Sequence, residues 1–140
     1  MHAHSGMFYE TKLFKSNLSS WDVSKVTTMT VMFGFSNYNG DLSGWSTTSL
    51  DDLSEMFHGA SEFDADLSSW STSKVTTMAN LFSDAVKFRG VGLENWDTSS
   101  VTDLSGTFFG AAAFDGDISS WNTEKVTTMK ALFYEASQFR

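Results

Sequence analysis

The segment Trp21–Phe33, W-D-V-S-K-V-T-T-M-T-V-M-F, decides the fold, because it recurs along the whole chain. Trp121–Phe133 reads W-N-T-E-K-V-T-T-M-K-A-L-F and carries nearly the full motif again. Successive tryptophans are 24, 25, 26 and 25 residues apart, and a phenylalanine follows each of them after twelve residues. The pairs are Trp21 and Phe33, Trp45 and Phe57, Trp70 and Phe82, Trp96 and Phe108, and Trp121 and Phe133. The spacing predicts a repeat of about 25 residues whose length varies only between Phe and the next Trp.

Apolar columns accompany the tryptophans in every repeat. Leucine or isoleucine stands three residues before Trp, valine or leucine five after it, and methionine or leucine eight after it. A second aromatic column contains Phe14, Tyr38, Phe63, Phe88, Phe114 and Phe139. A unit of this length cannot bury its own apolar face, so neighbouring units must stack into a continuous core.

The periodicity within the unit predicts two kinds of local structure. The short D-L-S-S-W segment, bounded by Gly, Asn and Asp, is typical of a strand, and Val, Met and Met spaced by three residues suit helical turns. We therefore expect one domain over residues 1–140, a repeat solenoid of about five and a half units. It would carry short parallel strands on one face and 3₁₀ or helical turns on the other, with the five tryptophans buried in one row.

The motif resembles the BspA-like leucine-rich repeats of bacterial surface proteins, in the variant with a W-D-x-S-x-V-T-x-M-x-x-M-F signature. The resemblance covers the chain from Met1 to Phe139. It implies that the repeat solenoid is leucine-rich-repeat-like, and that the protein is extracellular or on the cell surface and involved in adhesion.

Composition excludes several classes of protein. The 140 residues carry a formal net charge of -8, which argues against nucleic-acid binding, since that requires a cationic surface. The absence of cysteine excludes disulfides, thiol catalysis and cysteine-ligated zinc. The sequence shows no apolar run long enough to insert into a membrane, and Met1–Phe8 lacks the apolar core of a signal peptide.

An acidic column four residues before Trp suggests a cation site. Asp41, Asp66 and Asp117 belong to it, and Asp64 and Asp115 flank it. Stacked carboxylates repel one another, and calcium would relieve that repulsion. We therefore take Asp64, Asp66, Asp115 and Asp117 as candidate calcium ligands, against the alternative that they are turn residues at strand entries.

Two other columns have a functional and a structural interpretation. Thr27, Thr76, Thr102 and Thr127 lie in register and could order water, as in ice-binding proteins, or could be hydroxyls satisfied within turns. The tryptophans could form a platform for sugar rings, but their constant distance from a phenylalanine favours a core position. No constellation of catalytic residues is confined to a single unit, so we expect no enzyme.

We expect a binding or adhesion module whose strand-bearing face contacts a protein or a glycan. The residues expected on that face are Asp41, Asp66 and Asp117 with Ser43, Ser68, Glu94 and Ser119. The alternative is a structural spacer in a longer array, which would need no exposed aromatic surface. Because the last unit ends in apolar residues without a polar cap, we also expect a homodimer through the C-terminal end.

Overall fold

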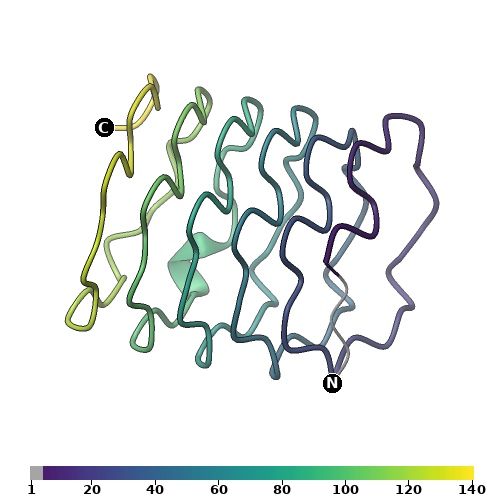
Figure 1. Cartoon of the computed structure of the whole chain (residues 1–140), viewed down its shortest axis with the longest axis horizontal. Helices are drawn as coiled ribbons and strands as arrows, with labels where there is room; N and C mark the ends of the chain where they lie inside the picture. Colours follow the sequence, from purple (N-terminus) through teal and green to yellow (C-terminus); the bar gives the residue numbers. More distant parts are fainter. Residues whose placement is uncertain (1–4) are drawn as a thin grey trace.

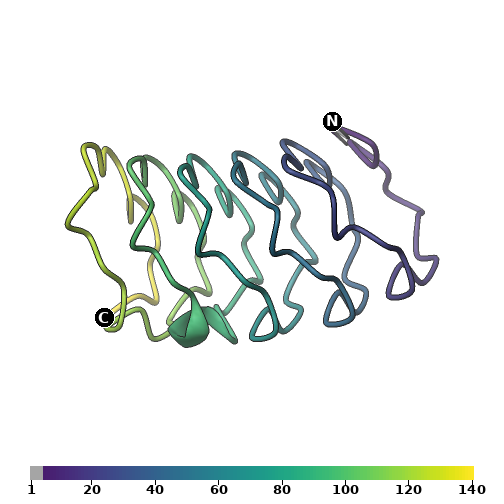
Figure 2. The ribbon, with the colours of Figure 1, turned by 90° about the horizontal axis from the view of Figure 1, so that it is seen from below.

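The computed structural model describes residues 5–140, so the first four residues of the expected domain lie outside the described residues. The chain winds into successive coils of about 25 residues that stack along the long axis, from purple to yellow in Figure 1. Figure 2 shows from below that each coil is an open loop beside the next one.

The expected face of short parallel strands is wrong. Among residues 5–140 there is no strand, only four isolated parallel bridges, and these lie outside the D-L-S-S-W segments. The bridged residues are Thr28, Asp52, Thr77, Asp103 and Thr128. At D-L-S-S-W the backbone turns instead, because the Trp45 N–H donates to the Leu42 carbonyl (3.2 Å) and the Ser43 N–H donates to the Asp41 carboxylate (2.8 Å). These local bonds use the donors that a sheet would need.

The expected helical face is also wrong. In the described part of the chain, the one helix is the three-residue 3₁₀ helix η1, Leu93–Asn95, drawn as a coiled ribbon in Figure 1. It begins after Gly92, which has a φ of 94°, and lies in the longest stretch between a phenylalanine and the next tryptophan. The architecture is therefore a stack of coils built from turns, and not a leucine-rich-repeat-like solenoid with parallel strands.

The coils are joined by backbone hydrogen bonds that alternate in direction along the M-x-x-M-F segment. The Val31 N–H donates to the Ser54 carbonyl of the next coil (3.1 Å), and the Phe33 N–H donates to the Met56 carbonyl of that coil (2.9 Å). Between them, the Met32 N–H turns back to the Met29 carbonyl of its own coil (3.1 Å), and after them the Gly34 N–H turns back to the Val31 carbonyl (2.9 Å). A strand would send its bonds to neighbouring strands and a helix would keep them to itself, so this segment is neither.

This alternation requires a left-handed backbone at two positions in each coil. The first position holds Gly6, Val31, Glu55, Asn80, Gly106 and Ala131, and the second holds Glu10, Phe35, Gly59, Asp84, Gly110 and Glu135; all have φ between 53° and 65°. Glycine adopts this conformation without strain, whereas a β-branched residue such as Val31 does so at a cost.

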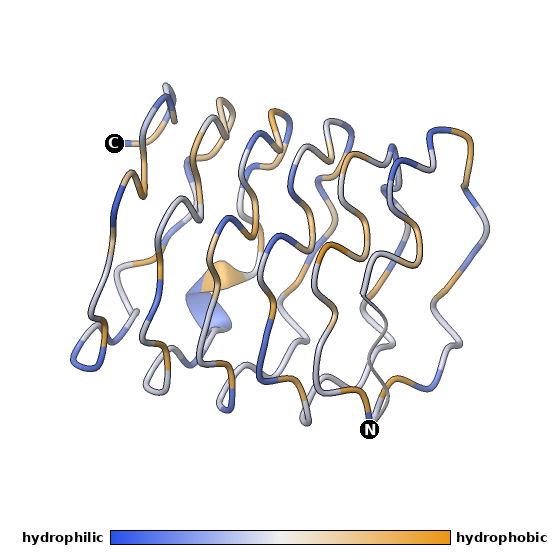
Figure 3. Ribbon diagram, viewed as in Figure 1, coloured by the Kyte–Doolittle hydropathy of each residue, from blue (hydrophilic) through white to orange (hydrophobic). Residues whose placement is uncertain are grey.

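The phenylalanine column forms the centre of the core. Rings in consecutive coils lie nearly parallel, with centroids 5.4–5.8 Å apart. The column contains Phe8, Phe33, Phe57, Phe82, Phe108 and Phe133. Rings of the second aromatic column stack on it within each coil, for example Phe63 on Phe57 at 3.8 Å. Figure 3 shows apolar stretches at the same place in successive coils.

The tryptophan row is buried as expected at Trp45, Trp70 and Trp96, which are 2–3% exposed. Their indole rings stack at 6.3 Å, and each indole N–H donates to a leucine carbonyl in the preceding coil at 2.8–3.2 Å. Trp121 is half-buried and continues the stack. The expectation is wrong for Trp21, which is 40% exposed, because no described coil lies before it to cover the ring.

Trp70→Ala should lower the free energy of unfolding by about 3–5 kcal/mol, because it leaves a cavity between two rings and removes one of the two hydrogen bonds that the Leu42 carbonyl accepts. Trp21→Ala is the matched control, since that ring is exposed and its indole N–H has no partner among residues 5–140. Urea denaturation measures both. Equal losses of unfolding free energy in the two variants would contradict the burial of Trp70 within the stacked row.

Val31→Asn should raise the free energy of unfolding by about 1 kcal/mol, because asparagine tolerates the left-handed conformation and valine does not. Asn80 already occupies the equivalent position two coils further on, with a φ of 53°. The reverse change, Asn80→Val, should therefore destabilise by a similar amount. Urea denaturation curves in which both variants shift the same way would contradict the assignment.

Candidate functional site

The residues expected on the ligand face lie in one exposed row, but their carboxylates are engaged in turns. Asp66 and Asp117 accept the Ser68 and Ser119 N–H groups at 2.8 and 2.9 Å, as Asp41 accepts that of Ser43. Ser43, Ser68, Ser119 and Glu94 are exposed, the last within η1. The row thus offers short, locally bonded polar groups.

These turns change the acidity of the carboxyl groups. Hydrogen bonds from Ser43, through its side chain first and then its backbone, lower the pKa of Asp41, and Ser119 does the same to Asp117. The backbone and then the side chain of Ser68 lower the pKa of Asp66, against a smaller opposing effect of the Asp41 charge. Asp41 and Asp66 occupy the same position in consecutive coils, whereas Gly92 separates Asp66 from Asp117 in the column.

The four candidate calcium ligands do not form one cluster. Asp64 accepts two hydrogen bonds from Arg89, from Nε at 2.6 Å and from the backbone N–H at 2.9 Å. Asp115 lies on the other side of that arginine, since its N–H donates to the Arg89 carbonyl (3.4 Å). Within residues 5–140 no three His, Asp or Glu side chains are grouped closely enough to hold a metal ion. Calcium binding stays a prediction.

The threonine column uses its hydroxyl groups to join coils. The Thr76 hydroxyl donates to the Asp51 carbonyl (3.2 Å), the Thr102 hydroxyl to the Thr76 carbonyl (3.2 Å), and the Thr127 hydroxyl to the Thr102 carbonyl (3.0 Å). This supports the structural interpretation of these hydroxyls over the ordering of water.

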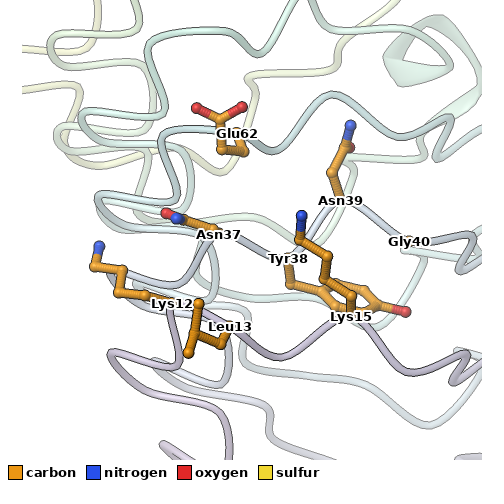
Figure 4. Close-up of a pocket in the computed structure, with 8 residues that line it drawn as sticks. All are labelled: Lys12, Leu13, Lys15, Asn37, Tyr38, Asn39, Gly40 and Glu62. Carbon is orange, nitrogen blue, oxygen red and sulfur yellow. The ribbon is translucent and has the colours of Figure 1, made fainter.

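A hollow of about 490 Å³ lies between the first three loops that carry the second aromatic column (Figure 4). Lys12, Lys15 and Glu62 line it, but Figure 4 shows their charged ends apart from one another, and Glu62 pairs with Lys87 at 2.8 Å. The Tyr38 hydroxyl is buried without a hydrogen-bond partner, and it points toward Gly40 and not toward the lysines. The hollow therefore has no convergent set of polar groups.

A varied set of residues, some exposed and some buried, lies just after the phenylalanine column, where the chain leaves the core. We call it the variable edge: Tyr9, Gly34, His58, Ser83, Phe109 and Tyr134, each with the residue that follows it, namely Glu10, Phe35, Gly59, Asp84, Gly110 and Glu135. Backbone bonds such as Phe35 N–H to the His58 carbonyl (2.7 Å) hold these pairs in register. Tyr9, Phe35 and Tyr134 are 43%, 37% and 57% exposed.

The rings on the variable edge are in contact with one another. Tyr9 meets Phe35 edge to face at 5.8 Å, Phe35 packs on His58 at 4.8 Å, and Phe109 stacks on Tyr134 at 5.1 Å. His58 Nδ1 lies 3.5 Å from a Glu55 oxygen, and its Nε2 lies 3.8 Å from an Asp84 oxygen. Exposed aromatic groups beside carboxylates can bind a ligand by stacking and by charge.

Sequence reasoning missed the variable edge as a ligand surface. The signal was present, because this column changes from Tyr to Gly, His, Ser, Phe and Tyr while the phenylalanine before it never changes. Its exposure could not be predicted, since it depends on the two left-handed positions that turn the chain outward.

The homodimer expected through the C-terminal end also stays a prediction. In the last described coil Met129 is 45% exposed, and Val126, Leu132 and Phe133 are half-buried. Either a second copy or a further coil would cover this surface.

Replacing Asp41, Asp66 and Asp117 together by Asn should flatten the loss of stability in acid. Because the folded-state pKa of each aspartate is lowered below its unfolded value of about 3.9, its contribution is present above that pH and is lost as the pH falls through the folded-state pKa. Asn17 already accepts the Ser19 N–H at 2.8 Å, so asparagine keeps the turn. Urea denaturation at neutral pH and near pH 3 measures how much free energy of unfolding each protein loses in acid. An equal loss in the unchanged protein and in the variant would contradict the prediction.

Comparison with known proteins places the chain in a family. The curated proteins and the solved structures each contain no match. In residues 5–140 no helix is long and apolar enough to cross a membrane. The family model described as "Mycoplasma protein of unknown function, DUF285" matches residues 2–90 and again residues 64–140, as a repetitive chain allows. Since these matches together reach from one end of the sequence to the other, the chain belongs to the DUF285 family, whose repeat-containing domains have no assigned function.

Proposed function

We propose that the chain is a non-enzymatic binding module that contacts a protein or a glycan with its variable edge. The observation that carries the proposal is the exposure of Tyr9, Phe35 and Tyr134 in a protein whose other aromatic columns are largely buried. Exposed aromatic groups cost free energy in water and are common anchors of binding surfaces. They favour a binding module over a structural spacer, which gains nothing from such groups.

The division of each coil into constant and varied positions supports the same function. The phenylalanine column is invariant because it fills the core, whereas the variable edge changes from each coil to the next, with the pair Tyr-Glu recurring only in the first and the last coil. A surface that changes from coil to coil presents one specific pattern on a regular frame, as extended repeat proteins do when they bind partners. A location outside the cell belongs to the proposal too, and it rests on the resemblance to BspA-like leucine-rich repeats.

A variant with Tyr9, Phe35 and Tyr134 replaced by Ser should lose binding to any ligand that the unchanged protein captures from an array of glycans and matrix proteins. The matched control replaces three exposed apolar residues outside the variable edge, Leu13, Val86 and Val91, which are 92%, 42% and 43% exposed. The control should keep its binding. Urea denaturation of both variants separates loss of contact from loss of folding.

If the control loses binding as fully as the edge variant, or if neither changes it, the variable edge is not the ligand surface.

A further inference from the structure

The N-terminal half of the variable edge combines exposed rings with carboxylates that no lysine or arginine of the described residues pairs, and this combination identifies a class of ligand. The inference rests on the proposed function, because it concerns the same surface. Phe35 lies over Gly59, where a Cβ atom would collide with the ring, and Tyr9 lies over Gly34 at a distance that a Cβ atom would make tight. The two rings thus pack on the backbone of the next coil and remain 43% and 37% exposed.

Three carboxylates lie beside these rings or beside His58, on which Phe35 packs. Glu10 follows Tyr9, and the Glu55 and Asp84 side chains, 44% and 50% exposed, lie on either side of His58. Desolvation raises the pKa of Tyr9, followed by the charge of Glu10, a side-chain hydrogen bond with Glu10 and then the charge of Glu55. These effects are consistent with a negative potential over the ring.

No lysine or arginine in residues 5–140 lies within 4.0 Å of these three carboxylates. Elsewhere in the stack the acids of neighbouring coils are compensated, Glu62 by Lys87 at 2.8 Å and Asp64 by Arg89 at 2.6 Å. The variable edge is therefore left with negative charge in a protein that already carries -8.

Classes of ligand differ in how favourably they would interact with this surface. An anion would be repelled, and an apolar ligand would strip water from the carboxylates without pairing them. A cationic side chain gains from both features, because it is attracted by the faces of the rings and by the carboxylates beside them.

The shape of the edge favours a polypeptide over a single small cation. The phenylalanine column advances by 5.4–5.8 Å per coil, so an extended peptide of about nine residues, at roughly 3.3 Å per residue, would run from the first coil to the last. At the far end Phe109 and Tyr134 form a second pair of rings, followed by the exposed Glu135. Exposed aromatic rings and acidic side chains thus occur together at both ends of the variable edge.

We propose that the variable edge binds a lysine- or arginine-rich segment of another polypeptide. Its cationic groups lie against the rings of Tyr9 and Phe35. The carboxylates of Glu10, Glu55 and Asp84 pair with those groups.

Fluorescence anisotropy of labelled nine-residue peptides tests the proposal. The probe alternates lysine with serine, and the comparison peptides alternate glutamate with serine or contain only glycine and serine. We expect the lysine peptide alone to bind, and to bind more weakly as salt is raised, because the charges are exposed and screened. Absence of binding by the lysine peptide at low salt would overturn the proposal.

Two variants separate site-specific binding from general attraction by an acidic protein. Glu55→Gln with Asp84→Asn should weaken binding of the lysine peptide about tenfold, within the range of two partly exposed charge pairs. Asp22→Asn with Asp97→Asn makes the same change in net charge at exposed turn positions outside the edge, and should change binding less than about twofold, the effect of weak long-range attraction. An equal effect of both pairs would overturn the proposal.

The contribution of the ring is measured separately. Phe35→Leu keeps an apolar side chain but removes the aromatic face, and should weaken binding about threefold, as expected for an exposed cation–π contact, whereas Phe35→Tyr should restore it. Unchanged binding by Phe35→Leu would contradict the role of the ring. If a glycan or a neutral protein from the array needs the edge while the lysine peptide does not bind, the proposed function stands and the basic ligand is wrong.

Discussion

The hydrogen bonds that alternate between one coil and the next are the constraint on which the rest of the structure depends. Along each M-x-x-M-F segment that is followed by another described coil, every second N–H crosses to that coil, as the Val31 and Phe33 N–H groups do, whereas the Met32 N–H between them turns back within its own coil. These donors are therefore satisfied without a strand or a helix. The crossing bonds hold the rings of the phenylalanine column in register, and the backward bonds turn the chain.

The same alternation determines which side chains can stand at each position. A residue in the left-handed conformation directs its side chain over the next coil, so the next coil often provides a glycine beneath it. Gly59 accommodates Phe35 in this way, and Gly110 accommodates Asp84. Glycine at these places serves two needs, since it adopts a positive φ without strain and leaves space for its neighbour.

Core and surface are separated within a few residues of sequence. Phe57 is fully buried, yet His58, directly after it, is partly exposed between two carboxylates. Substitutions on the variable edge can therefore change the chemistry of the surface without disturbing the aromatic stack. This separation is the physical basis for proposing that the variable edge contacts the ligand. The row of aspartates is less suited to that role, because its carboxylates are hydrogen-bonded within turns.

The sequence by itself determined the repeat, the interior columns and the burial of Trp45, Trp70 and Trp96, because regular spacing of large apolar residues reports directly on what must be removed from water. The strands predicted at D-L-S-S-W were wrong. A short alternation of polar and apolar residues is compatible both with a strand and with a turn closed by an aspartate side chain. Only the tertiary structure decided where the left-handed residues fall, and with them which rings reach the surface. Those positions accept Val31 and Phe35 as well as glycine, because bonds to the next coil compensate the strain, and no local pattern of residues records that compensation.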